Sequence, residues 1–179
     1  MIATALVELR GLVLPVLLLV VAACVLGGAL LARSPRGARL LPVLAALALV
    51  PVLLLTLAPT GDPSSPGFCT VQLAVPRPGS VEALANVVLM LPVALLAVLA
   101  GLRPSRVLVA GVALSAGIEA VQGAVGALGR ACDTNDLAMN TIGVGLGVAL
   151  GWATRTIVQR SGGGGPLSRE RPQVAERRA

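Results

Sequence analysis

Five apolar runs dominate the sequence, and each is about as long as a helix must be to cross a bilayer. A hydrocarbon core about 30 Å thick takes roughly 20 apolar residues in helical form. Such runs cover residues 11–32, 40–58, 83–102, 107–128 and 137–158. The chain is 56% hydrophobic and only 12% charged, whereas an average soluble domain has about 25% charged residues. The sequence therefore predicts an all-α, polytopic membrane bundle with about five transmembrane helices.

The arginines predict how this bundle lies in the membrane. All 14 basic residues are arginines. Eleven of them lie in the loops after the first and third runs and from the last turn of the fifth run onward; the other three are Arg10, Arg77 and Arg130. Because cytoplasmic loops carry the excess of basic residues, we expect the N-terminus outside and the C-terminus in the cytoplasm.

The same distribution divides the chain into three parts. Residues 1–39 are expected to form an N-terminal transmembrane helix and a cytoplasmic loop, residues 40–158 a four-helix membrane domain, and residues 159–179 a disordered basic cytoplasmic tail. The net charge of +6 comes from these loop and tail arginines. No nucleic-acid motif accompanies them, so we expect no nucleic-acid partner.

Polar residues gather at the end of the predicted bundle that is expected to face outward. Glu119 and Gln122 are three residues apart and share one helix face. Asn86 and Asn140 are expected on the first turns of the third and fifth helices. A carboxylate at membrane depth costs about 2.5–3.5 kcal/mol on insertion scales, so Glu119 must face the bundle interior. The residues expected to meet there are Asn86, Glu119, Gln122, Arg130, Asp133, Asp136 and Asn140.

We interpret this group as a functional site, with a purely structural hydrogen-bond network between helices as the alternative. Glu119 and Asp136 are the candidate catalytic residues, because a positioned carboxylate can exchange protons with a substrate. Ser115, one turn before Glu119, is a weaker candidate. The residues predicted to bind a ligand are Asn86, Gln122, Arg130, Asp133 and Asn140. The chain has no histidine, so we expect no metal site and no cofactor.

The cysteines and one set of glycines point to structural roles. Cys69 and Cys132 both fall in loops expected on the oxidising side, which predicts a disulfide between them. Three glycines spaced by four residues let another helix approach closely, either within the bundle or in a homodimer. These glycines are Gly143, Gly147 and Gly151.

The segment E-A-V-Q at residues 119–122, followed by R-A-C-D-T-N-D-L-A-M-N-T-I-G-V-G-L-G from Arg130, resembles the VanZ-like family of bacterial membrane proteins. That family has a Glu and a Gln on one helix and then R-x-x-D-x-x-D-x-x-x-N-x-x-G-x-x-x-G entering the next. Asn86 and Pro92 match an Asn followed by a Pro on the preceding helix. The resemblance covers roughly residues 40–158 and leaves out the first helix, the cysteine pair and the tail.

The resemblance implies a place in the bacterial cell membrane, because the family is named for a teicoplanin-resistance protein. We therefore expect the site to bind or process the head group of an envelope amphiphile: a lipid, a lipid-linked precursor or a lipoglycopeptide. Whether the protein is an enzyme is left open at this point. The alternative is a non-catalytic scaffold or a small transporter, although five spans without an internal repeat are unlike a standard secondary transporter.

Reporter fusions test the predicted orientation. Alkaline phosphatase is active only outside the cytoplasm, so a fusion after Pro59 should be active and a fusion after Ser161 should be inactive. We expect this result because arginines are in excess around the second fusion point, in the segment after the fifth apolar run. The opposite pattern of activities would invert the topology.

Overall fold

The computed structural model describes residues 10–59, 69–71 and 81–162. Within these ranges the chain forms five α-helices and one 3₁₀ turn, and the predicted all-α fold is confirmed. In the same ranges no strand is present, and the only extended pairing is an isolated bridge between Thr70 and Asp133. The elements are α2 (Arg10–Ala32), α3 (Pro35–Leu57), α4 (Val81–Leu99), α5 (Pro104–Ala124), the 3₁₀ turn η1 (Gly126–Leu128) and α6 (Thr134–Gly162).

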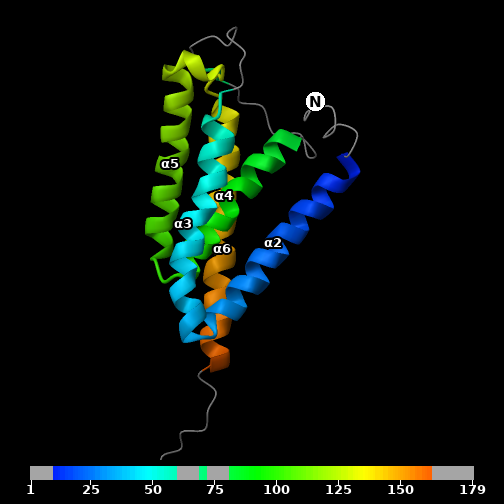
Figure 1. Cartoon of the computed structure of the whole chain (residues 1–179), viewed down its shortest axis with the longest axis vertical. Helices are drawn as coiled ribbons and strands as arrows, with labels where there is room; N and C mark the ends of the chain where they lie inside the picture. The colour runs from blue at the N-terminus through cyan, green and yellow to red at the C-terminus, as the bar shows by residue number, and fades with distance from the viewer. Residues whose placement is uncertain (1–9, 60–68, 72–80, 163–179) are drawn as a thin grey trace, which may run out of the picture.

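Four of these helices are long and apolar enough to cross a membrane: α3, α4, α5 and α6. In α2 the apolar segment Leu18–Ala32 is shorter, so the fifth crossing stays a prediction. Successive helices run in alternating directions, and α2 leans away from the bundle at its N-terminal end (Figure 1). Large apolar side chains such as Leu19, Val109 and Trp152 are exposed on the outside, as a surface in contact with lipid requires.

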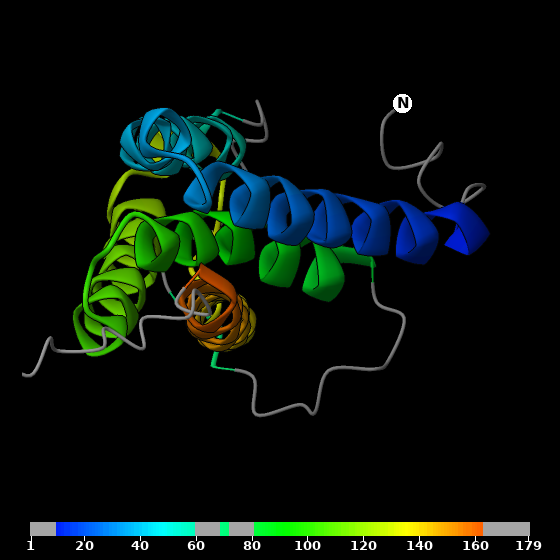
Figure 2. The same cartoon turned by 90° about the horizontal axis from the view of Figure 1, so that it is seen from below.

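The core is organised around α4, which lies between α2 and α6 in Figure 2. One buried cluster joins α4 to α3, α5 and α6; its members are Val52, Met90, Ala94, Val98, Val107, Ile118 and Val144. A second cluster joins α4 to α3, with α2 packed against it; its members are Leu41, Leu91, Leu95, Leu96 and Leu99. The two clusters use different faces of α4, which therefore fixes the positions of all the others.

Local sequence signals explain where the helices begin. The Ser34 hydroxyl accepts a hydrogen bond from the Gly37 amide at 3.0 Å, and Pro35 occupies the first helical position of α3. Pro104 has the same place in α5. A serine cap and a proline at this position both suit a helix start, because the first amides of a helix have no partner within it.

The predicted boundaries are wrong at both ends of the connection between α5 and α6. Helix α5 ends at Ala124 instead of Leu128, because Val125 leaves helical geometry. The 3₁₀ turn η1 follows and is capped by Gly129, which is left-handed with φ of 61°. Helix α6 begins at Thr134 rather than at residue 137, which places Asp136 in its first turn.

Two further expectations differ from the structure by a few residues. Asn86 and Asn140 lie on the second turns of α4 and α6, not on the first, because both helices start earlier than expected. At its other end α6 continues to Gly162, so the first four residues of the predicted tail are helical. The rest of that tail lies outside the described residues.

The three glycines on α6 lie directly against the backbone of α4. A Cβ added at Gly143 or Gly147 would collide with the carbonyl oxygen of Val87 or Leu91, and one at Gly151 would lie 2.9 Å from the Leu95 carbonyl oxygen. Close backbone approach of this kind needs small residues. The glycine face is therefore occupied within the bundle, and a homodimer would have to use another surface.

This packing predicts opposite effects for two neighbouring glycines of α6. Gly147→Ala should destabilise the protein by about 1–3 kcal/mol, because a rigid backbone atom blocks the new methyl group. Gly145→Ala should be neutral or slightly stabilising, since nothing lies within 4 Å of its added Cβ and alanine favours helix. Thermal unfolding of the two purified variants in detergent makes the comparison, and equal melting temperatures would contradict the packing.

Candidate functional site

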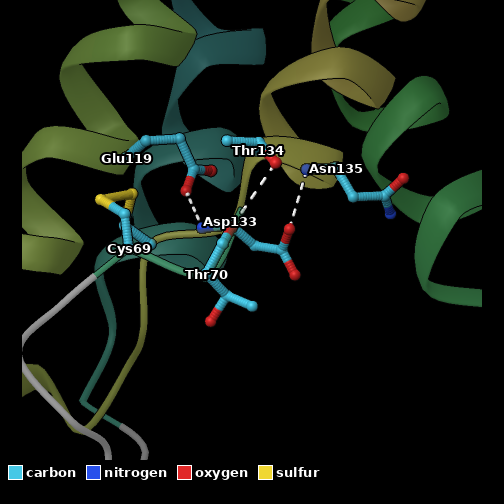
Figure 3. The surroundings of a disulfide bond; sticks show 7 residues. Cys69, Thr70, Glu119, Asp133, Thr134 and Asn135 are labelled. Atoms are coloured by element: carbon cyan, nitrogen blue, oxygen red, sulfur yellow. Dashed lines mark hydrogen bonds between the residues drawn. A yellow bond between two sulfur atoms is a disulfide. The ribbon is translucent and has the colours of Figure 1, made fainter. Parts of the chain in front are cut away.

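A short strap of chain, residues 69–71, crosses the end of the bundle where α5 ends and α6 begins. A disulfide joins Cys69 of the strap to Cys132, 63 residues later in the chain (Figure 3). Gly123 of α5 leaves room for this bond, since a Cβ there would lie 3.2 Å from the Cys132 Cβ and 3.4 Å from the Cys69 Sγ. We call this end of the bundle the disulfide end.

Backbone hydrogen bonds hold the strap in register with the start of α6. The Thr70 amide donates to the Cys132 carbonyl at 2.8 Å, and the Thr134 amide donates to the Thr70 carbonyl at 3.2 Å. Thr70 thereby pairs with Asp133 in a parallel bridge. The disulfide and these bonds together fix the position of the Asp133 amide.

That amide donates a hydrogen bond to Glu119. Glu119 lies on α5 and is only 6% exposed as a residue. Its carboxylate accepts from the Asp133 N–H through Oε2 at 2.8 Å (Figure 3). The Asp133 carboxylate caps α6 by accepting from the Asn135 N–H at 2.8 Å. Both carboxylates thus lie at the N-terminus of α6, where free amides and the helix dipole favour negative charge.

A second polar contact joins α4 to α6. The Asn86 side-chain amide donates to Asp136 Oδ1 at 2.7 Å. Asp136 also interacts electrostatically with Asp133, Glu82 and Arg130. The disulfide end therefore carries polar groups from α4, α5, α6 and the connection between the last two helices.

Two of the predicted ligand-binding residues point instead to the end of α3. The Gln122 side-chain amide donates to the Thr56 carbonyl at 2.7 Å, and Arg130 Nε donates to the Ala58 carbonyl at 3.1 Å. The last carbonyls of a helix have no partner within it, and these two side chains supply one. Among the contacts of the described residues, only the Nε of the Arg130 guanidinium is engaged.

The register of the antiparallel pair α5 and α6 is fixed by two contacts. An added Cβ at Gly111 would meet the Val144 side chain, and one at Gly123 would meet Cys132. One helical turn brings side chains on each helix back to the same face. Between these contacts, the residues placed opposite each other are Ser115 with Asn140, and Glu119 with Asp136.

The deeper of these pairs is unusual because it is closed off and unsatisfied. Ser115 is 0% exposed and Asn140 is 2% exposed. Within the described part of the chain, neither Ser115 Oγ nor Asn140 Oδ1 has a hydrogen-bond partner. A buried polar atom without a partner costs about 1–3 kcal/mol, and such atoms in native structures call for an explanation.

The structure thus brings together most of the predicted site, though not all of it in one place. One group lies at the disulfide end and consists of Glu119, Asp133, Asp136 and Asn86. Asn140 lies one helical turn deeper in the bundle. Gln122 and Arg130 bind α3. Sequence reasoning missed the Thr56 and Ala58 carbonyls and the Thr70 backbone, because backbone partners leave no signal in side-chain identity. For Ser115, the only signal in the sequence was its spacing of one helical turn from Glu119.

A comparison with known protein families finds a match over most of the chain. The family model VanZ/LLP1 matches residues 16–155. The chain belongs to the VanZ/LLP1 family. The match begins within α2, so the first helix is part of the family region, contrary to the expectation that the resemblance starts near residue 40. No curated protein and no solved structure matches the chain.

The disulfide is expected to stabilise this VanZ/LLP1 protein. Replacing both Cys69 and Cys132 by serine should lower the free energy of unfolding by about 2–4 kcal/mol, because the bond closes a long loop. Thermal unfolding in detergent measures the loss. Cys24→Ala is the matched control, since Cys24 is a free thiol on α2. A double variant as stable as the control would show that the strap holds without its covalent bond.

Proposed function

We propose that the disulfide end of this membrane protein binds the head group of an envelope amphiphile: a lipid, a lipid-linked precursor or a lipoglycopeptide. The observation that carries the proposal is Glu119, a carboxylate within a membrane-spanning helix that is buried and held by the Asp133 amide. Ionisable residues inside membrane helices are costly and characteristically mark functional sites. Polar bonds between membrane helices average only about 0.6 kcal/mol, so helix association alone is a weak reason for this residue.

The geometry supports distinct tasks for the polar groups. Glu119 and Asp136 are acceptors for hydroxyl or amine groups of a ligand. Arg130 is oriented through its Nε by the Ala58 carbonyl, which leaves the η nitrogens to meet a phosphate or carboxylate. A head group bound at this level keeps its acyl chains in the bilayer. In a bacterial envelope such binding would bear on the response to teicoplanin-type antibiotics.

The competing function is a non-catalytic scaffold, in which the same residues only join helices. The contacts of Gln122 and Arg130 with α3 favour it, because both bonds satisfy helix-end carbonyls without any ligand. The two functions differ in what Glu119 does. A scaffold needs its hydrogen bond with Asp133, whereas a binding site needs its negative charge.

Glu119→Gln separates charge from hydrogen bonding. The amide oxygen of glutamine still accepts from the Asp133 N–H, so the variant should accumulate normally in the membrane. Loss of the charge should lower the enrichment of the bound amphiphile by about tenfold, as expected for one charge-assisted hydrogen bond. Mass spectrometry of lipids that copurify in polymer-bounded membrane discs measures the enrichment over bulk membrane.

Thr154→Val is the matched control, because Thr154 is a buried polar residue of α6 away from the disulfide end. It should retain the enrichment of the unmodified protein. If no envelope component is enriched with the unmodified protein, or if Glu119→Gln retains full enrichment, head-group binding through Glu119 is wrong. If Glu119→Gln accumulates normally and also retains full enrichment, the scaffold function is the better account, because the variant keeps the hydrogen bond with the Asp133 amide.

A further inference from the structure

The charges around the site are unevenly balanced. At the disulfide end, α4, α5, α6 and the α5–α6 connection carry four carboxylates and one guanidinium within the described residues. These are Glu82, Glu119, Asp133, Asp136 and Arg130. Glu119 interacts electrostatically with Asp133 and Asp136, and Asp136 with Glu82. A ligand that brings a positive charge would relieve this repulsion, whereas a purely anionic ligand would add to it.

A second, independent feature lies directly below these carboxylates. Ser115 Oγ and Asn140 Oδ1 are buried oxygens that have no hydrogen-bond partner among the residues that the structure describes. They occupy the α5–α6 seam one turn below Glu119 and Asp136, on the same helix faces, because four residues separate each pair. Asn140 Oδ1 can only accept a hydrogen bond, and Ser115 Oγ can accept as well as donate, so an N–H group of a ligand would satisfy either oxygen. Both features therefore favour a ligand rich in donors.

A metal ion is a poorer match than an organic cation. In the part of the chain that the structure describes, no group of three or more His, Cys, Asp or Glu side chains is arranged to hold a metal. A protonated amine presents three donors and a positive charge. Its charge suits the carboxylates, and its donors suit both the carboxylates and the neutral oxygens beneath them.

We propose that the site recognises a protonated amine on the head group, bound by Glu119 and Asp136 with Ser115 and Asn140 as the deeper acceptors. This inference rests on the proposed function, because it names the chemical class of the head group bound there. Ser115 and Asn140 are sealed from solvent, so the proposal requires side chains along the α5–α6 seam to move aside when the amine binds. Arg130, already held by α3, then meets the anionic part of the same head group.

A matched pair of lipids tests the amine directly. Phosphatidylethanolamine and its N-acetyl derivative share the phosphate and the acyl chains and differ in the charge on nitrogen. The protein is placed in nanodiscs of phosphatidylglycerol containing equal amounts of the two probes, and native mass spectrometry measures which is retained. We expect about tenfold preference for the free amine, reduced to near parity in Glu119→Gln.

The outcomes distinguish this inference from the proposed function. Equal retention of both lipids by the unmodified protein, with loss of both in Glu119→Gln, overturns the amine while head-group binding stands. Retention that Glu119→Gln leaves unchanged for both lipids removes head-group binding through Glu119 and the amine together. Preference for the N-acetyl form also overturns the inference.

Ser115→Ala tests the deeper acceptors with a readout that a structural role would not move. Removing an unsatisfied buried hydroxyl should keep or raise the melting temperature. If Ser115 accepts from the amine, the same variant should lose part of the preference, by about threefold or more. Thr154→Val should leave the preference intact. An unchanged preference in Ser115→Ala would remove the deeper acceptors and overturn the site as proposed.

Discussion

Polar groups inside a membrane bundle must find their partners within the protein, because lipid offers none. In this chain the partners are mostly backbone atoms. Glu119 accepts from the Asp133 amide, Gln122 donates to the Thr56 carbonyl, and Arg130 to the Ala58 carbonyl. These three bonds tie α5 and its connection to the ends of α3 and α6. The arrangement of the disulfide end depends on these three hydrogen bonds. By holding the helix ends together, they also position the remaining polar groups.

The rest of this arrangement comes from close backbone packing. The glycine face of α6 lets α4 approach until backbone carbonyls of α4 lie directly against the glycines. At this distance Asn86 of α4 reaches Asp136 of α6. The geometry of the polar site therefore depends on the packing of α4 against α6. Widening that contact would also break the hydrogen bond between Asn86 and Asp136.

The sequence predicts the helices well because length and apolar content decide the fold of a membrane chain. It also predicts that Glu119, Asp133, Asp136 and Asn86 meet, since helix spacing and alternating topology place them at one end. It fails where backbone atoms or turn geometry decide. The early end of α5 at Ala124 depends on the conformation of Val125, and the turn after it on the left-handed conformation of Gly129. The hydrogen bond from Arg130 to the Ala58 carbonyl at the end of α3 could not be predicted from residue types. An isolated arginine near carboxylates suggests an ion pair instead.

The strap of residues 69–71 connects the site to the membrane topology that the arginine distribution predicts. The strap is tethered by a disulfide, and it holds the amide that Glu119 binds. Thiols stay reduced in the cytoplasm and are oxidised beyond the membrane. In the predicted topology, a molecule whose loop had not yet reached the oxidising side would lack the covalent tether that helps to hold the Asp133 amide. Maturation of the carboxylate environment would then be the last step of biogenesis, later than insertion and helix packing.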